Sequence, residues 1–158
     1  MLRSLFIRNS FFTIIQPGIV AGLVPYLLLR LQDDELWPLH LSLVNYIGLF
    51  LLTTGLVMLL TCIIRFATEG KGTLSPIDPT RFLVIKGLYQ YSRNPMYIGV
   101  ILILMGEAIF FLSIILSIYT VIIFTAFHLF ILLHEEPRLR KVFGESYNKY
   151  CNEVKRWI

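Results

Sequence analysis

The sequence is poor in charge and in cysteine. Only 15% of its 158 residues are charged, whereas 56% are hydrophobic and the mean hydropathy is +0.73. Soluble domains are nearer ~45–50% apolar. The two cysteines, Cys62 and Cys151, are too few for a disulfide framework, and their spacing does not indicate a metal site. The composition therefore excludes a disulfide-stabilised secreted domain and predicts an integral membrane protein.

The sequence also lacks the motifs of common soluble enzymes. It contains no Gly-x-Gly-x-x-Gly that would open a helix after a strand, no phosphate-binding loop, no catalytic triad and no set of metal ligands. The net charge of +4 does not call for nucleic acid, because basic rims are ordinary in membrane proteins. We also expect no signal peptide, since Gln16, Pro17 and Gly18 interrupt the first apolar run and no small-residue cleavage site follows it.

Long apolar runs dominate what is present. Residues 11–29 and 43–64 carry no charge, and residues 96–133 carry one acid, Glu107. A membrane-spanning helix needs roughly 20 residues. The last run is long enough for two crossings joined by a short turn, which we expect near residues 112–114. The sequence therefore predicts an all-α integral membrane protein with four transmembrane helices.

The cations lie almost entirely on one side of these four predicted spans. Of the 14 lysines and arginines, all but Arg30 precede the first span, lie between the second and third, or follow the fourth. The positive-inside rule then places both termini and the 65–95 loop in the cytoplasm, with the 31–42 loop outside.

The chain divides into two regions of different character. Residues 1–64 read as two plain transmembrane helices with an external loop. Residues 65–158 hold a long loop, the helix hairpin and a C-terminal amphipathic helix, in which Leu139, Phe143, Tyr147, Tyr150 and Val154 recur at intervals of three or four. Long loops usually carry function. The structural alternative is an interfacial linker followed by a helix that lies on the anionic leaflet.

Polar residues cluster where the hairpin begins and ends. The stretch YSRNPMYIGV, residues 91–100, places Arg93, Asn94 and Tyr97 at the edge of an apolar run, and Glu135 and Glu136 directly follow the last span. Because an antiparallel hairpin brings its two ends together, we expect these groups to meet. They could hold a polar ligand. The structural alternative is that Asn94 caps a helix with Pro95 in its first position, while Arg93 pairs with the acids.

This arrangement resembles the isoprenylcysteine carboxyl methyltransferase family and the related phospholipid N-methyltransferases. The shared pattern is Gly-x-Tyr, then Arg-(His or Asn)-Pro-x-Tyr-x-Gly, then Glu-Glu-x-x-Leu-x-x-x-Phe-Gly-x-x-Tyr-x-x-Tyr. The resemblance covers residues 70–157. The matching positions are Gly87, Tyr89, Arg93, Pro95, Tyr97, Gly99, Glu135, Glu136, Leu139, Phe143, Gly144, Tyr147 and Tyr150.

The resemblance implies S-adenosylmethionine (SAM) as methyl donor, bound on the cytoplasmic side without a Rossmann fold and without a metal. It implies Arg93, Glu135 and Glu136 as catalytic residues. The cofactor-binding residues it implies are Arg81, Phe82, Leu83, Val84, Tyr89, Asn94, Pro95, Met96, Tyr97, Glu135 and Glu136. Many relatives have histidine where this chain has Asn94, and asparagine cannot act as a general base there.

The chemistry of SAM suits these residue types. Carboxylates can accept from its ammonium group and its ribose hydroxyls, and amide donors near a helix N-terminus can bind its carboxylate. Aromatic rings such as Tyr89 and Tyr97 can face its sulfonium. We expect Glu107 not to be catalytic, because it lies about eleven residues into its span; it should face the bundle interior or snorkel outward.

The acceptor is less specified than the donor. A membrane-embedded or lipid-like acceptor is expected, either the carboxylate of an isoprenylated cysteine or the amine of a phospholipid. Two other functions stay open: an NADPH-dependent sterol-type reductase and a small non-enzymatic membrane scaffold. The oligomeric state is not specified by the sequence.

Overall fold

The computed structural model describes residues 16–32, 41–69, 83 and 85–157. This part of the chain is helical and contains no strand, as the all-α prediction requires. Its elements are η1 (Ile19–Leu23), α2 (Val24–Arg30), α3 (Leu43–Glu69), η2 (Gly87–Gln90), α4 (Pro95–Phe110), α5 (Ile114–Phe130), η3 (Ile131–Glu135), α6 (Glu136–Phe143) and α7 (Glu145–Glu153).

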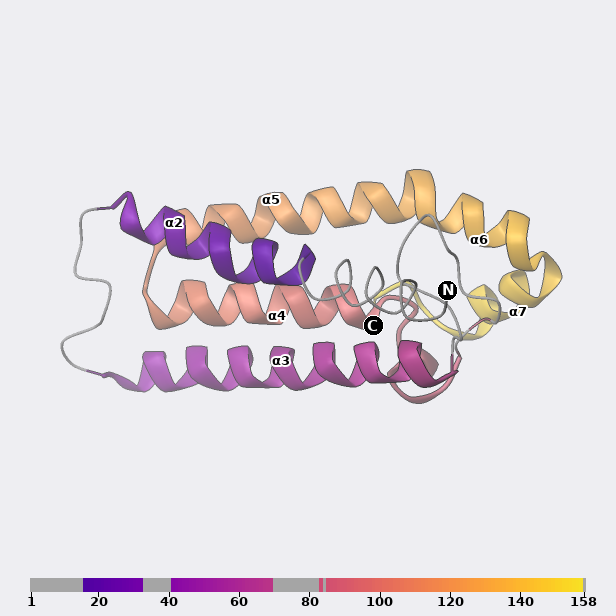
Figure 1. Ribbon diagram of the computed structural model, residues 1–158, viewed down its shortest axis with the longest axis horizontal. Helices are drawn as coiled ribbons and strands as arrows, with labels where there is room; N and C mark the ends of the chain where they lie inside the picture. Colours follow the sequence, from indigo (N-terminus) through magenta and orange to yellow (C-terminus); the bar gives the residue numbers. More distant parts are fainter. Residues whose placement is uncertain (1–15, 33–40, 70–82, 84, 158) are drawn as a thin grey trace, which may run out of the picture.

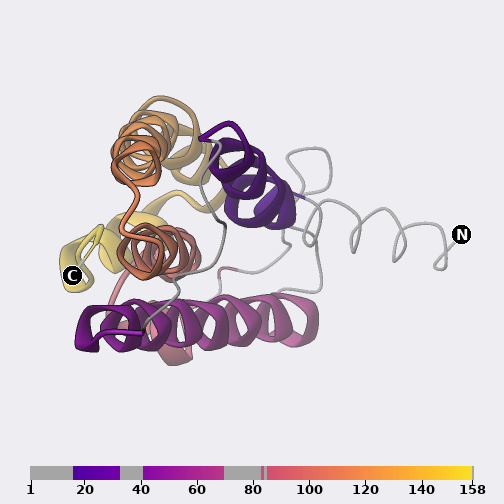
Figure 2. The same ribbon diagram turned by 90° about the vertical axis from the view of Figure 1, so that its left-hand side faces the viewer.

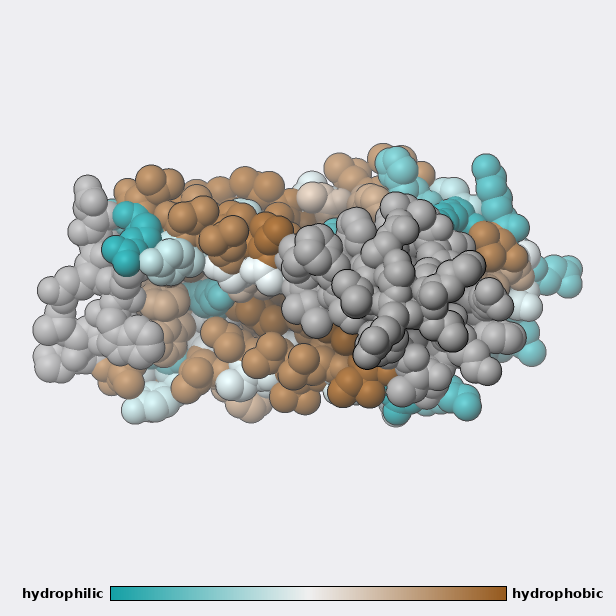
Figure 3. All heavy atoms as spheres, in the orientation of Figure 1, coloured by the Kyte–Doolittle hydropathy of each residue, from teal (hydrophilic) through white to brown (hydrophobic). Residues whose placement is uncertain are grey.

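Helix α4 lies at the centre of an elongated bundle. It packs between α3 on one side and α5 on the other, and α2 lies against α5 (Figures 1 and 2). Apolar side chains cover much of the bundle's length on the face shown in Figure 3, and hydrophilic ones gather towards its two ends. A long apolar body with polar ends is the surface that a bilayer requires.

Two helical runs are long and apolar enough to cross a membrane: Leu43–Arg65 within α3, and Ile114–Phe143, which joins α5, η3 and α6. Only 22% and 17% of their most apolar windows are buried, so neither resembles the core helix of a soluble protein. Helix α4 is apolar but has 16 residues, or about 24 Å. Two of the four predicted spans are thus supported, and the other two stay predictions. The hairpin turn lies at residues 111–113, close to its predicted place.

The contact between α3 and α4 depends on glycine. A Cβ added to Gly48 would lie 2.5 Å from the backbone nitrogen of Phe110, and one added to Gly55 would lie 2.6 Å from the carbonyl oxygen of Gly99. A Cβ on Gly106 would lie 2.5 Å from the backbone nitrogen of Leu52. Because these neighbours are backbone atoms, they cannot rotate away. Small residues that let two backbones approach are the usual basis of helix packing in membranes.

The first helix departs from regular α-helical geometry just before Pro25. Residues Ile19–Leu23 form a π-turn, in which each N–H reaches back five residues. In that register the nitrogen of residue 25 would bond to the carbonyl of Val20, but proline has no N–H. The hydroxyl of Tyr119, on α5, donates to the Val20 oxygen at 3.0 Å instead. The side chain replaces the missing donor and fixes the first helix to α5.

The C-terminal region differs from the prediction of one amphipathic helix. Helix α6 continues the run of α5 and η3, with Pro137 in its first turn, and then ends at Gly144. Gly144 has φ 53°, a left-handed conformation that glycine adopts without steric cost. The chain reverses there, and α7 buries Tyr147 and Tyr150 against Val154. The predicted single helix is therefore wrong, because this glycine allows a turn that brings the C-terminal residues back to the bundle.

The two predicted loops are only partly covered. Most of the 31–42 loop lies outside the described residues. In the 65–95 loop, α3 extends to Glu69, and residues 70–82 and 84 lie outside the described part.

We predict that Gly106→Ala destabilises the protein by roughly 1–3 kcal/mol, because the new methyl group forces α3 and α4 apart. Thermal unfolding in detergent would measure this. The matched control is Gly18→Ala, where an added Cβ meets nothing within 4 Å. Equal melting temperatures for the two variants would contradict the proposed role of the glycine contact.

Candidate functional site

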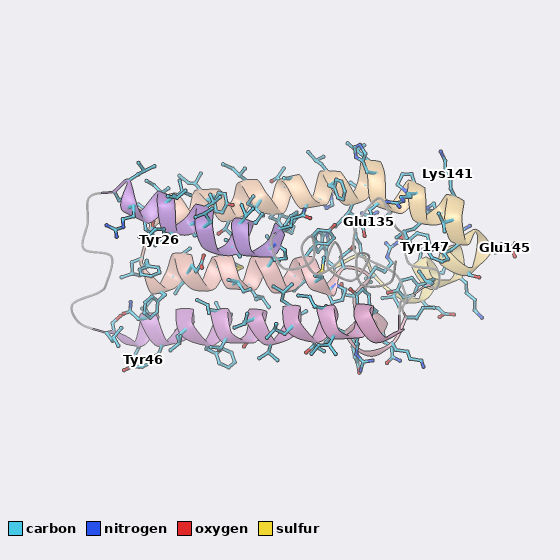
Figure 4. All side chains as sticks on the ribbon, viewed as in Figure 1. Tyr26, Tyr46, Glu135, Lys141, Glu145 and Tyr147 are labelled. Carbon is cyan, nitrogen blue, oxygen red and sulfur yellow. The ribbon has the colours of Figure 1, made fainter. Side chains whose placement is uncertain are left out.

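Polar side chains converge at the end of the bundle where α4 begins and α5 gives way to α6. We call this the polar end and define it by Arg93, Tyr97, Glu135 and Glu136. Figure 4 shows Glu135 and Tyr147 at this end, opposite Tyr26 and Tyr46. The meeting of the α4 start with the two acids, predicted from the hairpin, is present in the structure.

Tyr97 and Glu135 form the first contact across the hairpin. The Tyr97 hydroxyl donates to Oε2 of Glu135 at 2.8 Å. The Tyr97 ring packs against Phe127 of α5, with 4.7 Å between ring centroids. Both Tyr97 and Glu135 are half-buried, so the pair is shielded from water without being sealed.

Glu136 forms a separate and more buried network. Arg156 donates to both of its oxygens, Nε to Oε1 at 2.7 Å and Nη2 to Oε2 at 3.0 Å. Nη1 of Arg93 lies 3.3 Å from Oε1, and the side chains of Arg93 and Glu136 are only 10% and 9% exposed. The hydrogen bonds to Glu136 raise the pKa of Arg156, which stays charged. Arg93 therefore pairs with an acid, as the structural alternative expected.

Arg93 makes contacts beyond the one with Glu136. Its Nη1 also donates to Sγ of Cys151 at 2.6 Å, and its backbone nitrogen donates to the Lys155 carbonyl at 3.0 Å. Its Nε is buried and has no hydrogen-bond partner among the described residues. An unsatisfied buried donor is costly, roughly 1–3 kcal/mol, and calls for an explanation.

Asn94 occupies the N-cap position of α4, but its side chain does not cap the helix. Its Nδ2 instead donates to the carbonyl of Arg156 at 3.0 Å. Ser92 Oγ donates to the same carbonyl at 3.3 Å and accepts from the Asn94 backbone nitrogen at 3.1 Å. The predicted side-chain cap is thus wrong, because the returning C-terminal segment offers Asn94 an acceptor. Pro95 does occupy the first position of α4 and is buried.

The remaining predicted residues lie around this centre. Tyr89, in η2, is buried beside Cys62, and its carbonyl accepts from the Tyr150 hydroxyl at 2.6 Å. Burial raises the pKa of Tyr150 to about 12, so this hydroxyl remains a donor. Met96 packs against Tyr89 and Cys62. Leu83 packs against the cluster of Tyr147, Tyr150 and Val154. Arg81, Phe82 and Val84 lie outside the described residues.

The sequence analysis missed the C-terminal residues that complete the polar end. Arg156 binds Glu136, and Trp157 Nε1 donates to His128 Nδ1 at 3.2 Å while its ring lies 5.2 Å from that of Phe124. Residues 155–157 come after the last residue of the periodic apolar pattern and show no periodicity of their own. Only the two cations followed by a tryptophan could have drawn attention to them.

Glu107 lies apart from the polar end, near the opposite end of α4. It is the thirteenth residue of that helix, so about 18 Å of helix separates it from Pro95. Its Oε2 is buried without a partner among the described residues, so of the two expected orientations, towards the interior or outward, the structure favours the interior. Within the same part of the chain, no three His, Cys, Asp or Glu side chains lie close enough to hold a metal ion.

These features describe an all-helical membrane protein with a polar site at one end of its bundle. The family model of phospholipid methyltransferases matches residues 43–146, more than half of the chain. The chain therefore belongs to the phospholipid methyltransferase family. A search of curated proteins and a search of solved structures each gave no match. The result supports the broader resemblance drawn from the sequence and does not single out its isoprenylcysteine branch.

We predict that Glu136→Gln lowers the melting temperature markedly, because it leaves two arginines facing a neutral amide. Removing one partner of a buried ion pair costs about 3–5 kcal/mol. Glu145→Gln on α7, where the side chain is exposed, is the matched control and should melt like the wild type. The network would be unimportant for stability if both variants melted alike.

Proposed function

We propose that this protein transfers a methyl group from SAM to a lipid acceptor at the polar end. The observation that carries the proposal is the Tyr97–Glu135 pair near Arg93, whose Nε has no acceptor among the described residues, in a chain of the phospholipid methyltransferase family. Arg93 Nε–H is a buried donor that suits the carboxylate of SAM. Glu135 is an acid that suits an ammonium group.

The two neighbouring acids take different parts in this proposal. Successive residues of a helix point about 100° apart, so Glu135 and Glu136 do not face the same side. Both oxygens of Glu136 are already bound by Arg156. Glu135 has one hydrogen bond, from Tyr97. We therefore assign contact with the ligand to Glu135 and a role in holding the site together to Glu136. We assign the same role to Asn94, because its side-chain amide donates to the carbonyl of Arg156.

SAM supplies a methyl group already activated by its positive sulfur. The protein has to align donor and acceptor and to exclude water. Half-buried Tyr97 and Glu135, backed by Phe127, provide a partly shielded surface for this.

The acceptor that we propose is the amine of a phospholipid headgroup. An ammonium must lose a proton before it can attack a methyl group, and Glu135 is positioned at the polar end to accept one. The family match favours this class. The second candidate is the carboxylate of an isoprenylated cysteine, which the sequence motifs favour and which needs no base.

We further propose that the protein crosses the membrane four times, with the polar end and both termini in the cytoplasm. With four spans, all cations except Arg30 would lie on that side, as the positive-inside rule requires. The acceptor would then reach the site sideways from the bilayer, since its apolar tail cannot leave the lipid cheaply.

We predict that Glu135→Gln weakens SAM binding about tenfold to a hundredfold, the loss expected for one charge-assisted hydrogen bond. Calorimetry on detergent-purified protein would measure it. Tyr97→Phe should cost less, because the ring remains. Glu107→Gln is the matched control: it removes an acid distant from the site and should leave SAM affinity and methyl transfer unchanged.

The same measurement separates the competing functions. Binding of NADPH without SAM would indicate a reductase, and binding of neither would indicate a scaffold. With labelled SAM, transfer to phosphatidylethanolamine vesicles supports the amine acceptor. Transfer only to an isoprenylated cysteine would replace it with the second candidate. Unchanged SAM affinity in Glu135→Gln would refute the proposed site.

We predict that a cysteine replacing Ser146, exposed on α7, reacts with a membrane-impermeant thiol reagent only after cells are opened. A cysteine replacing Leu31, which is 79% exposed beyond α2, should react in intact cells. The parent chain, with Cys62 and Cys151, gives the background. Labelling of position 146 from outside would reverse the proposed orientation.

A further inference from the structure

We propose that Arg156 is a positioning residue of the polar end. By pairing with Glu136, it holds residues 155–157 against the start of α4 and orients Arg93. This inference rests on the proposed function, since it concerns the same site. It assigns a role to a segment that no motif covers.

The first support is the set of acceptors that this segment offers to α4. The Lys155 carbonyl accepts from the Arg93 backbone nitrogen at 3.0 Å. The Arg156 carbonyl accepts from Asn94 Nδ2 at 3.0 Å and from Ser92 Oγ at 3.3 Å. Buried polar groups need hydrogen-bond partners. Here these donors are met by backbone that the fold must hold in place, because Ser92 and Asn94 are buried.

The second support is the geometry of the Arg156 side chain. Its guanidinium donates through Nε and Nη2 to the two oxygens of Glu136, at 2.7 and 3.0 Å. This two-point contact fixes the direction of the side chain as well as its distance. Lysine would keep the charge but could not make the planar two-point contact. The position of the Arg156 carbonyl, and with it the contacts to Ser92 and Asn94, therefore depends on an arginine at this position.

The third support is the reach of the segment. Val154 is buried against Tyr147 and Tyr150, and Trp157 bonds to His128 on α5, seven residues before Glu135. Seven helical residues span about 10 Å. Residues 154–157 thus contact α7, α6, α5 and the residues that lead into α4.

The consequence for the site runs through Arg93. Glu136 Oε1 is shared by Arg156 and Arg93, at 2.7 and 3.3 Å. Without Arg156, both carboxylate oxygens become available to Arg93, whose guanidinium can then turn towards them. Its Nε would leave the direction in which we place the cofactor carboxylate. Loss of Arg156 should therefore weaken cofactor binding even in folded protein.

The experiment compares Arg156→Lys and Arg156→Ala with Lys149→Ala, a control that removes an exposed cation from α7. Three quantities are measured on each: melting temperature, amide hydrogen exchange over residues 92–98 without cofactor, and affinity for S-adenosylhomocysteine. We expect Arg156→Lys to melt like the wild type while its affinity falls about tenfold. Exchange at Arg93 and its neighbours should rise at least about fivefold in both Arg156 variants, and Lys149→Ala should match the wild type throughout.

Wild-type affinity and exchange in Arg156→Lys would overturn the proposal, since charge alone would then suffice. A lower melting temperature with unchanged affinity would also overturn it, leaving Arg156 a stabilising role only. If Arg156→Ala does not fold, Arg156→Lys still decides the matter. Should the wild type bind neither SAM nor its product, the proposed function fails, and hydrogen exchange alone then decides whether Arg156 holds the start of α4.

Discussion

The polar end depends on the ion pairs of the Glu136 carboxylate. It lies where the long helical run leaves the apolar body, and it binds one arginine from the start of α4 and one from the returning C-terminal segment. A charge in so shielded a place is stable only when fully paired. Three segments distant in sequence are therefore held in one arrangement by one side chain. Among the described residues, the neighbouring acid Glu135 accepts a hydrogen bond from Tyr97 instead.

Much of this arrangement could be predicted from the sequence. Uncharged runs marked α3 and the hairpin, and the shortness of the hairpin turn required that Tyr97 and Arg93 meet the two acids. What failed was the reading of the C-terminal region. The periodic apolar pattern continues across Gly144, whereas the positive φ of this glycine lets the chain reverse there. Periodicity describes single elements and carries no information about a reversal, so neither the carbonyl that engages Asn94 nor the partner of Arg156 could be foreseen.

Membership in the phospholipid methyltransferase family and the geometry of the site answer different questions. The family indicates the class of reaction. The geometry distinguishes residues that a motif treats alike. Two consecutive glutamates differ because a helix turns about 100° per residue, so one faces two arginines and the other faces a tyrosine hydroxyl. The side chain of Asn94, which the motif places beside a ligand, donates to the carbonyl of Arg156. The hydrogen-bond partners of each side chain distinguish these three residues.

The glycine contact between α3 and α4 has a mechanical consequence. Because the two backbones touch at Gly48, Gly55 and Gly106, neither helix can slide or roll without driving main-chain atoms together. Helices α3 and α4 therefore behave as one rigid unit. The other side of α4 meets its neighbours through side chains, which can change rotamer. The first helix is held to α5 by the hydroxyl of Tyr119, which donates to the Val20 carbonyl in the π-turn. The lipid acceptor that we propose would therefore enter on that more deformable side of the bundle.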